Sequence, residues 1–178
     1  MTALSSVNSL LVAISMVACV SSLAAQNQAA SSPPCSAPEH RQFDFWVGVW
    51  EVQDSTGTVL GHNTISRALG GCAIHEDWTS AAGGYAGNSY NLYDASRKRW
   101  HQTWVDNQGG LLQLDGSFEN GKMILSGETI GQDGSPTLNR ITWEPMQGGR
   151  VRQLWESSTD KGETWAVLFD GIYIKNNE

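Results

Sequence analysis

The sequence predicts an all-β protein, a single antiparallel up-and-down β-barrel of about ten strands. From Phe43 onward, short runs rich in Trp, Tyr, Val and Ile follow one another, and Gly, Asn and Asp separate them at regular intervals. An open sheet of so many short strands would leave two unpaired edges and would tend to curl. Closure into a barrel removes both edges. A two-sheet sandwich is the alternative that the sequence leaves open.

The expected strands are bounded by turn signals. Asn120-Gly121 stands between two alternating runs and predicts a hairpin, because both residues of such a turn must tolerate positive φ. Gly148-Gly149 marks another turn. Residues 38–45 alone favour a short helical segment, since Pro38 occupies a permitted first-turn position. The ranges expected to form strands are 45–53, 59–68, 72–80, 86–94, 99–106, 110–118, 121–129, 137–145, 149–157 and 164–175.

The N-terminal segment differs in kind from the rest, because the first charged residue is Glu39. Residues 10–20 form an apolar run that is too short to span a bilayer and is followed by small residues, as in a secretory signal. We therefore expect residues 1–24 to be a signal peptide and the protein to be exported, to the periplasm or beyond. A lipoprotein signal is the rival interpretation, in which the lipobox-like string 16–19 would place a lipid on Cys19.

Residues 25–38 are small, polar and proline-containing, which predicts a flexible tether before a barrel domain of residues 39–178. Cys35 and Cys72 are the two cysteines that would remain after cleavage. In an oxidising compartment such a pair is expected to be bridged, and the bridge would stabilise the fold by about 3 to 4 kcal/mol. Two separate thiols are the alternative.

Charge and motifs narrow the function classes. The formal net charge is -7, from 18 acidic and 11 basic residues without basic blocks, which argues against a nucleic-acid partner. The length suits one domain with a sizeable core, expected to be a monomer without a transmembrane span. The sequence has no Gly-x-Ser-x-Gly, Walker loop or His-Glu-x-x-His. We expect no cofactor.

Three strings carry a resemblance to a known family. They are Phe43-Asp-Phe-Trp-x-Gly48-x-Trp50, Gly71-Cys-x-Ile-x-Glu76-x-Trp78, and Trp100-x-Gln-x-Trp104-Val-Asp106. Together they resemble the uncharacterised bacterial lipocalin-like proteins called DUF1579, and Gly-x-Trp on the first strand is the lipocalin and calycin hallmark. The resemblance covers residues 35–173. It implies a calycin-like barrel in which Trp46 and Trp50 pack at a plugged end, but no activity, because a fold does not fix a function.

Alternation along the strands selects the candidate site. In a strand, residues two apart share a face, so Glu76 lies with Trp78, and Gln102 with Trp104. If these faces point inward, the interior is aromatic with a few polar groups, as a small-molecule pocket requires. If they point outward, they form a surface for a protein partner. The hypothesis is binding of a small apolar or aromatic molecule by Glu76, Trp78, Gln102, Trp104, Arg140 and Arg152.

Two other functions stay open. A pocket-type enzyme of the isomerase or cyclase kind would use Glu76 as its acid or base, with a pKa raised by burial beside Trp78. An envelope scaffold would bind another protein through exposed aromatic side chains.

Two further patterns point to structure more than to chemistry. Residues 158–165 match the Asp-box pattern Ser-x-Asp-x-Gly-x-Thr-Trp of sialidase propellers, but one copy in so short a chain favours a hairpin turn. In a regular strand, the side chains of His75 and Asp77 point to one face and that of Glu76 to the other, so the three cannot form one site. His75 and His101 could meet across strands, yet they lack a carboxylate cluster, so no metal site is expected.

Overall fold

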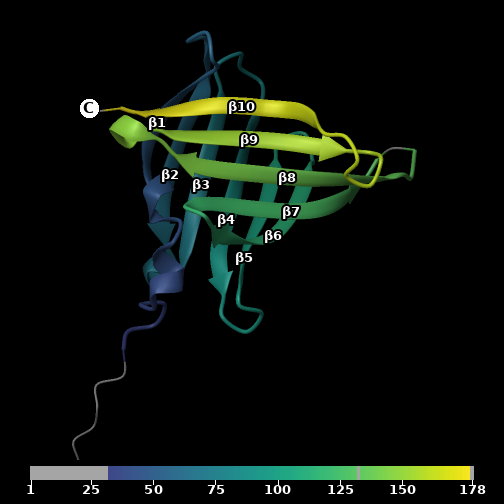
Figure 1. Ribbon diagram of the computed structural model, residues 1–178. Coiled ribbons are helices and arrows are strands. Elements are labelled where there is room, and N and C mark those ends of the chain that lie inside the picture. Colours follow the sequence, from purple (N-terminus) through teal and green to yellow (C-terminus); the bar gives the residue numbers. More distant parts are fainter. Residues whose placement is uncertain (1–31, 132, 177–178) are drawn as a thin grey trace, which may run out of the picture. The chain divides into compact units, whose positions relative to one another are not determined.

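The structure is a computed structural model that describes residues 32–131 and 133–176. Its ten strands form a closed antiparallel barrel, in which each strand pairs with the next along the chain and β10 returns to pair with β1 (Figure 1). The predicted fold class is therefore confirmed. The expected signal peptide, Cys19 and residues 25–31 of the tether lie outside the described residues.

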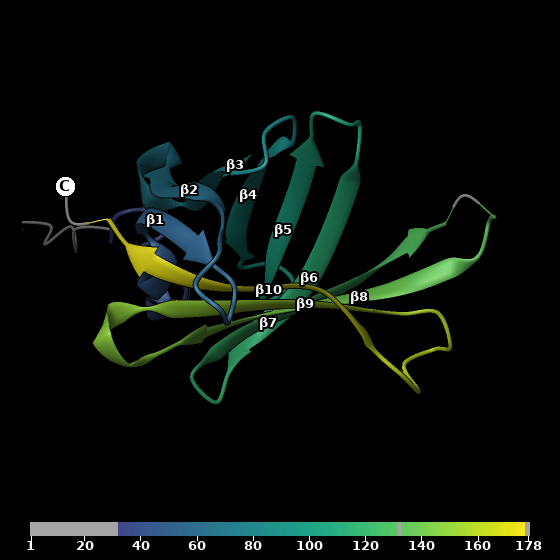
Figure 2. The same cartoon turned by 90° about the horizontal axis from the view of Figure 1, so that it is seen from above.

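Every expected strand is present, with ends that differ by three residues or fewer. The strands are β1 (Gly48–Gln53), β2 (Val59–Ala68), β3 (Ala73–Ser80), β4 (Ala86–Asp94), β5 (Arg99–Asp106), β6 (Leu111–Glu119), β7 (Lys122–Ile130), β8 (Pro136–Pro145), β9 (Val151–Ser158) and β10 (Ala166–Lys175). Figures 1 and 2 show β7 to β10 running across β2 to β6, so that the barrel wall has two crossing halves.

The expected helical segment consists of two short 3-10 helices, η1 (Pro38–Arg41) and η2 (Asp44–Trp46). Behind them, Trp46 and Trp50 are fully buried, and the Trp50 indole donates to the Trp46 carbonyl at 2.9 Å. Phe43 stacks on Trp46 with ring centroids 4.8 Å apart. These rings fill one end of the barrel, which we call the closed end.

A disulfide joins Cys35 to Cys72 and thereby ties the segment before η1 to the start of β3. The Arg41 guanidinium strengthens this link, because it donates to the carbonyls of Cys35 and Gly71. The two short helices are therefore held against the strands by a covalent bond and by hydrogen bonds.

Side chains alternate between the interior and the outer face, as the period of two requires. In β3, Ile74, Glu76 and Trp78 are buried, whereas His75 and Asp77 lie on the outside. Within the described residues, no helix is long and apolar enough to cross a membrane.

Candidate ligand-binding site

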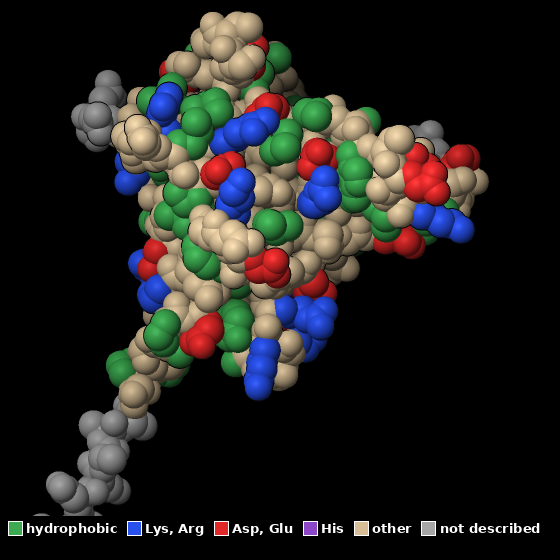
Figure 3. All heavy atoms as spheres, in the orientation of Figure 1, with side chains coloured by type: hydrophobic (Ala, Val, Ile, Leu, Met, Phe, Trp, Pro, Cys, Tyr) green, Lys and Arg blue, Asp and Glu red, His purple; other side chains and the backbone are tan. Residues whose placement is uncertain are grey.

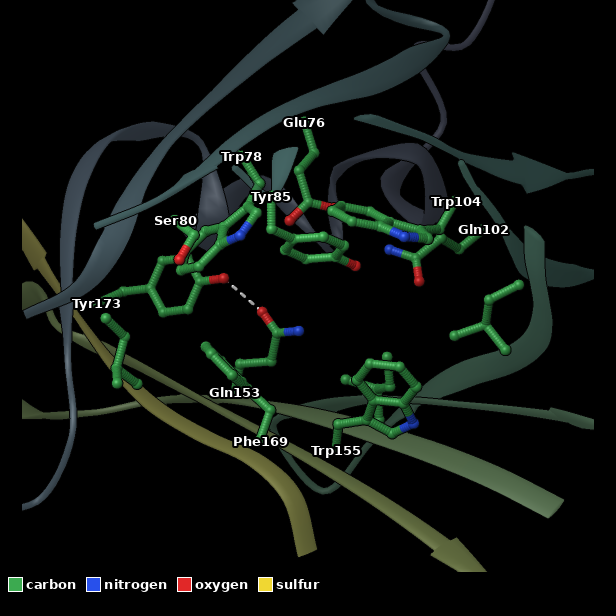
Figure 4. Close-up of a pocket in the computed structure, with 13 residues that line it drawn as sticks. Glu76, Trp78, Ser80, Tyr85, Gln102, Trp104, Gln153, Trp155, Phe169 and Tyr173 are labelled. Atoms are coloured by element: carbon green, nitrogen blue, oxygen red, sulfur yellow. Dashed lines mark hydrogen bonds between the residues drawn. The ribbon is translucent and has the colours of Figure 1, made fainter. Parts of the chain in front are cut away.

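A cavity of about 290 Å³ lies inside the barrel, with aromatic and polar side chains around it (Figure 4). It lies toward the end opposite the closed end, which we call the open end, where its lining residues Ser80 and Tyr85 adjoin the turn after β3. Its volume is near the lower limit for small-molecule sites in proteins. Most of its walls are apolar, and a few polar groups lie deeper. The lining residues are Leu60, Glu76, Trp78, Ser80, Tyr85, Gln102, Trp104, Leu112, Ile141, Gln153, Trp155, Phe169 and Tyr173.

Inward-facing glycines make room for two of the cavity's tryptophans. A Cβ atom at Gly87 would stand 2.2 Å from the Trp104 ring, and one at Gly61 would stand 2.6 Å from the Trp78 ring. Such distances are far below van der Waals contact, so each indole lies directly over the bare backbone of a neighbouring strand. The rings thus line the wall and leave the centre of the barrel open.

The indole N–H groups of Trp155 and Trp104 and the hydroxyl of Tyr85, near the entrance of the cavity, donate hydrogen bonds to other side chains of the protein. Trp155 Nε1 donates to Asn139 Oδ1 at 3.0 Å. Trp104 Nε1 and the Tyr85 hydroxyl both donate to one Asp106 carboxylate oxygen, at 3.4 and 3.2 Å. Backbone amides of the following turn also bind Asp106 and lower its pKa, so the carboxylate stays charged behind the two rings.

Glu76 occupies the middle of β3 and is only 4% exposed. Asn63 Nδ2 donates to its Oε1 at 2.8 Å, and the Ser89 hydroxyl donates to its Oε2 at 2.6 Å. Burial raises the pKa of this carboxyl to about 7, although the two hydrogen bonds act in the opposite direction. Within the described residues, no Lys, Arg or His lines the cavity, so no basic side chain balances the charge of Glu76 there.

A chain of hydrogen bonds fixes the orientation of Gln102. Asn91 Nδ2 donates to the Ile74 carbonyl at 3.4 Å and to the Ser89 hydroxyl at 2.9 Å, so Asn91 Oδ1 must be the acceptor for Gln102. Gln102 Nε2 donates to that oxygen at 2.9 Å. The Gln102 carbonyl oxygen is therefore left to face the cavity as an acceptor (Figure 4).

Tyr173 and Gln153 supply the polar groups of the facing wall. The Tyr173 hydroxyl accepts from Asn63 Nδ2 at 3.1 Å and donates to Gln153 Oε1 at 2.5 Å (Figure 4). Burial, together with the nearby charge of Glu76, raises the pKa of Tyr173 well above its ordinary value. The Gln153 amide nitrogen then remains as a donor beside the cavity.

Four of the six sequence-predicted residues, Glu76, Trp78, Gln102 and Trp104, line this cavity. The expectation that Arg140 and Arg152 also face the interior is wrong. They lie on the outer face of β8 and β9, where they pair with carboxylates of neighbouring strands, Glu156 at 2.9 Å and Asp170 at 2.7 Å. The interior positions of these strands belong to apolar or neutral side chains, among them Ile141, Gln153 and Trp155. Burying a guanidinium inside would have cost much of its hydration energy.

Sequence reasoning missed several lining residues. Gln153 and Trp155 share a face of β9, and this alternation could have indicated their role, whereas the prediction assigns Arg152, on the opposite face, to the site. Phe169 and Tyr173 follow the same period on β10. Tyr85 precedes β4 in a turn, where no periodicity predicts its direction.

The Asp-box segment forms a turn between β9 and β10. Asp160 accepts from the Ser158 hydroxyl at 2.7 Å and from the Thr164 amide at 2.9 Å, and Trp165 Nε1 donates to the Gly162 carbonyl at 3.1 Å. These hydrogen bonds all lie within the hairpin itself.

The two histidines do not come together. His75 Nε2 contacts Asn88 Oδ1 at 2.8 Å, and His101 Nδ1 contacts Asp115 Oδ1 at 2.9 Å. Figure 3 shows acidic and basic side chains interspersed over one face of the barrel.

No family model matches the chain, and comparison with curated proteins found no match.

Proposed function

We propose that this is an exported binding protein that holds a small apolar or aromatic molecule inside its barrel. The observation that carries the proposal is the cavity of about 290 Å³, which has aromatic walls and several polar side chains directed toward it, among them Glu76, Gln102 and Gln153. Apolar walls with a few placed polar groups are the usual composition of ligand sites. A barrel that served only as a packed scaffold would fill this space with side chains.

Two further parts of the proposal have separate support. Membership of the lipocalin-like DUF1579 proteins is supported by the strings around Trp50, Glu76 and Trp104. Export is supported by the apolar run of residues 10–20 and by the Cys35–Cys72 disulfide, a bond that persists in oxidising compartments.

Native mass spectrometry of the secreted protein tests the proposal, because it would show a retained ligand, the disulfide and any lipid on Cys19 in one spectrum. Titration with small aromatic and aliphatic compounds should then change the fluorescence of Trp78, Trp104 and Trp155. A matched pair of variants localises the binding. Ile141→Trp places an indole in the cavity and should abolish binding, whereas Thr142→Trp adds the same ring on the outer face and should preserve it.

Binding that survives Ile141→Trp in a folded protein would contradict the interior site. So would the absence of both a retained ligand and any fluorescence response across the compound panel.

A second candidate function is acid–base catalysis of an isomerase or cyclase kind. The observation that favours it is a carboxyl group, Glu76, in an aromatic cavity with a pKa of about 7, where one group both donates and accepts protons at neutral pH. A ligand recovered by mass spectrometry should then gain deuterium on carbon when it is incubated with the protein in D₂O, and Glu76→Gln should prevent this. A ligand that stays free of deuterium would argue against catalysis.

A scaffold that binds through an aromatic surface has less support. Tyr90 is the only large aromatic side chain that is strongly exposed among the described residues. Binding to another protein through such a patch would require several exposed rings close together.

A further inference from the structure

We infer that the ligand is an organic cation, a protonated amine or quaternary ammonium on an apolar body, with its charge beside the Glu76 carboxylate and its body between the tryptophans. This inference rests on the proposed function and names the chemical class of its ligand.

The first support is the charge imbalance of the cavity. Glu76 receives hydrogen bonds only from Asn63 and Ser89, both neutral, and no basic residue lines the cavity among the residues that the structure describes. A buried carboxylate without a cationic partner is unfavourable, because two hydrogen bonds from neutral groups replace only part of the hydration that it has lost. A ligand cation would supply the missing partner, and an anionic ligand would add a second negative charge.

The second support is the composition of the walls. Trp78, Trp104, Trp155 and Tyr85 surround the space in front of Glu76 (Figure 4). A cation is attracted to the face of an aromatic ring, most strongly to tryptophan, and this attraction grows when water is excluded. The charged Asp106 carboxylate behind Trp104 and Tyr85 adds to the negative potential at the same wall.

The third support is the distribution of charge between the two ends of the barrel. In an up-and-down barrel alternate turns lie at the same end, so the turns after β1, β3, β5, β7 and β9 all surround the entrance. The acidic residues in or beside these turns are Asp54, Asp106, Asp133, Asp160 and Glu163. The one basic residue there is Lys161. Counted in the same way, the closed end has the acidic residues Asp94 and Glu119 and the basic residues Arg97, Lys98, Arg99, Lys122 and Arg150, so its turns are net positive whereas those of the entrance are net negative.

This distribution favours the approach of a cation. Hydrogen bonds within their own turns lower the pKa of Asp54, Asp133 and Asp160, so these side chains remain charged at neutral pH. Figure 3 shows acidic side chains gathered where the turns of β7–β8 and β9–β10 lie. A cleft rimmed by charge of one sign concentrates ligands of the opposite sign.

The pH dependence of binding follows from the same site. The titratable groups that face Glu76 are Tyr173 and Tyr85, and burial raises the pKa of both, so neither titrates between pH 5 and 9. The other neighbours, Asn63, Ser89 and Gln102, are neutral. For an amine that stays protonated across this range, affinity should fall about tenfold for each pH unit below the pKa of Glu76, because only the ionised form is competent.

Three isosteric probes test the inference: 2-phenylethylamine, 2-phenylethanol and phenylacetate, which carry a positive, a neutral and a negative end on one ring. Fluorescence titration at pH 8 should give an affinity for the amine at least about tenfold above that for the alcohol, consistent with a charge-assisted contact, and the weakest binding for the acid. Equal or tighter binding of the alcohol or the acid would overturn the inference but leave the proposed function intact. If no compound of any charge binds, the proposed function itself fails.

A pair of variants assigns the effect to one carboxyl. Glu76→Gln should reduce amine affinity to the affinity of the same variant for the alcohol, and it should remove the pH dependence of amine binding. Asp77 is the next residue of β3 but is exposed on the outer face, so Asp77→Asn should change neither the amine affinity nor its pH dependence. Should Glu76→Gln fail to fold, the pH profile of the wild-type protein gives the same answer, and amine affinity that is constant from pH 5 to 8 would contradict the inference.

Discussion

At the scale of single residues, the Glu76 carboxyl group links protonation to folding. Its pKa rises from 4.5 to about 7 on folding, chiefly because burial disfavours the charged form. Between these values the folded protein holds more protons than the unfolded chain, so the free energy of unfolding falls as pH rises. The loss begins near pH 4.5, is complete above about pH 7 and is on the order of 3 kcal/mol.

Urea denaturation at pH 5 and pH 8, with the disulfide intact, checks this prediction. Wild-type protein should lose more stability over the interval than Glu76→Gln, whose buried amide does not ionise. A bound amine should reduce the wild-type loss, because it offsets the uncompensated charge. Identical pH slopes for the two proteins would show that Glu76 does not change its protonation on folding.

Part of the site could be predicted residue by residue. Glu76 and Trp78 on β3, and Gln102 and Trp104 on β5, were placed together by alternation alone, and the cavity contains all four. Alternation says which residues share a face but not which face points inward. For Arg140 and Arg152 this choice was wrong, because ion pairs with neighbouring strands satisfy them outside the barrel.

At the scale of structural elements, the strands could be predicted because each is bounded by local turn chemistry. The turn at Asn120 and Gly121 has positive φ at both residues, as the sequence requires. The first expected strand began too early, since residues 44–46 form η2 and Trp46 turns into the core. The direction of the Tyr85 side chain could not be predicted, because its hydroxyl is held by Asp106, which is 21 residues away in the sequence.

The Cys35–Cys72 bridge is expected to act on stability and not on binding. It closes a segment with a sequence separation of 37 and fastens η1 and η2 over the closed end, whereas the cavity opens at the other end. Replacing both cysteines by serine should lower the free energy of unfolding by about 3 to 4 kcal/mol.

Urea denaturation of the double variant measures this loss, and ligand titration of its folded form should give the wild-type affinity. Reduction of the wild-type protein with dithiothreitol provides a second route to the same state. An affinity that falls when the bridge is removed would mean that the closed end controls the shape of the cavity.

At the scale of the whole barrel, the opposite charges of its two ends should appear in the kinetics of binding. Attraction between an acidic entrance and a cation is screened by salt, with a Debye length of about 30 Å at about 0.01 M and about 3 Å at about 1 M. The association rate of 2-phenylethylamine should therefore fall several-fold between these concentrations, while that of 2-phenylethanol stays nearly constant.

Stopped-flow tryptophan fluorescence measures both rates. Phenylacetate serves as the converse control, since its association should become faster when the acidic entrance is screened. An amine rate that does not respond to salt would remove the role assigned to the turns at the open end, although the contact with Glu76 would be unaffected.

The glycines beneath the two indoles have a consequence for ligand size. The diameter of the cavity is governed by the smallest residues of the barrel, because Gly61 and Gly87 allow Trp78 and Trp104 to recede into the wall. A methyl group at either position would push the indole ring into the cavity, so that only a smaller ligand would fit. The size of ligand that the protein selects can thus be changed at a residue that does not contact the ligand.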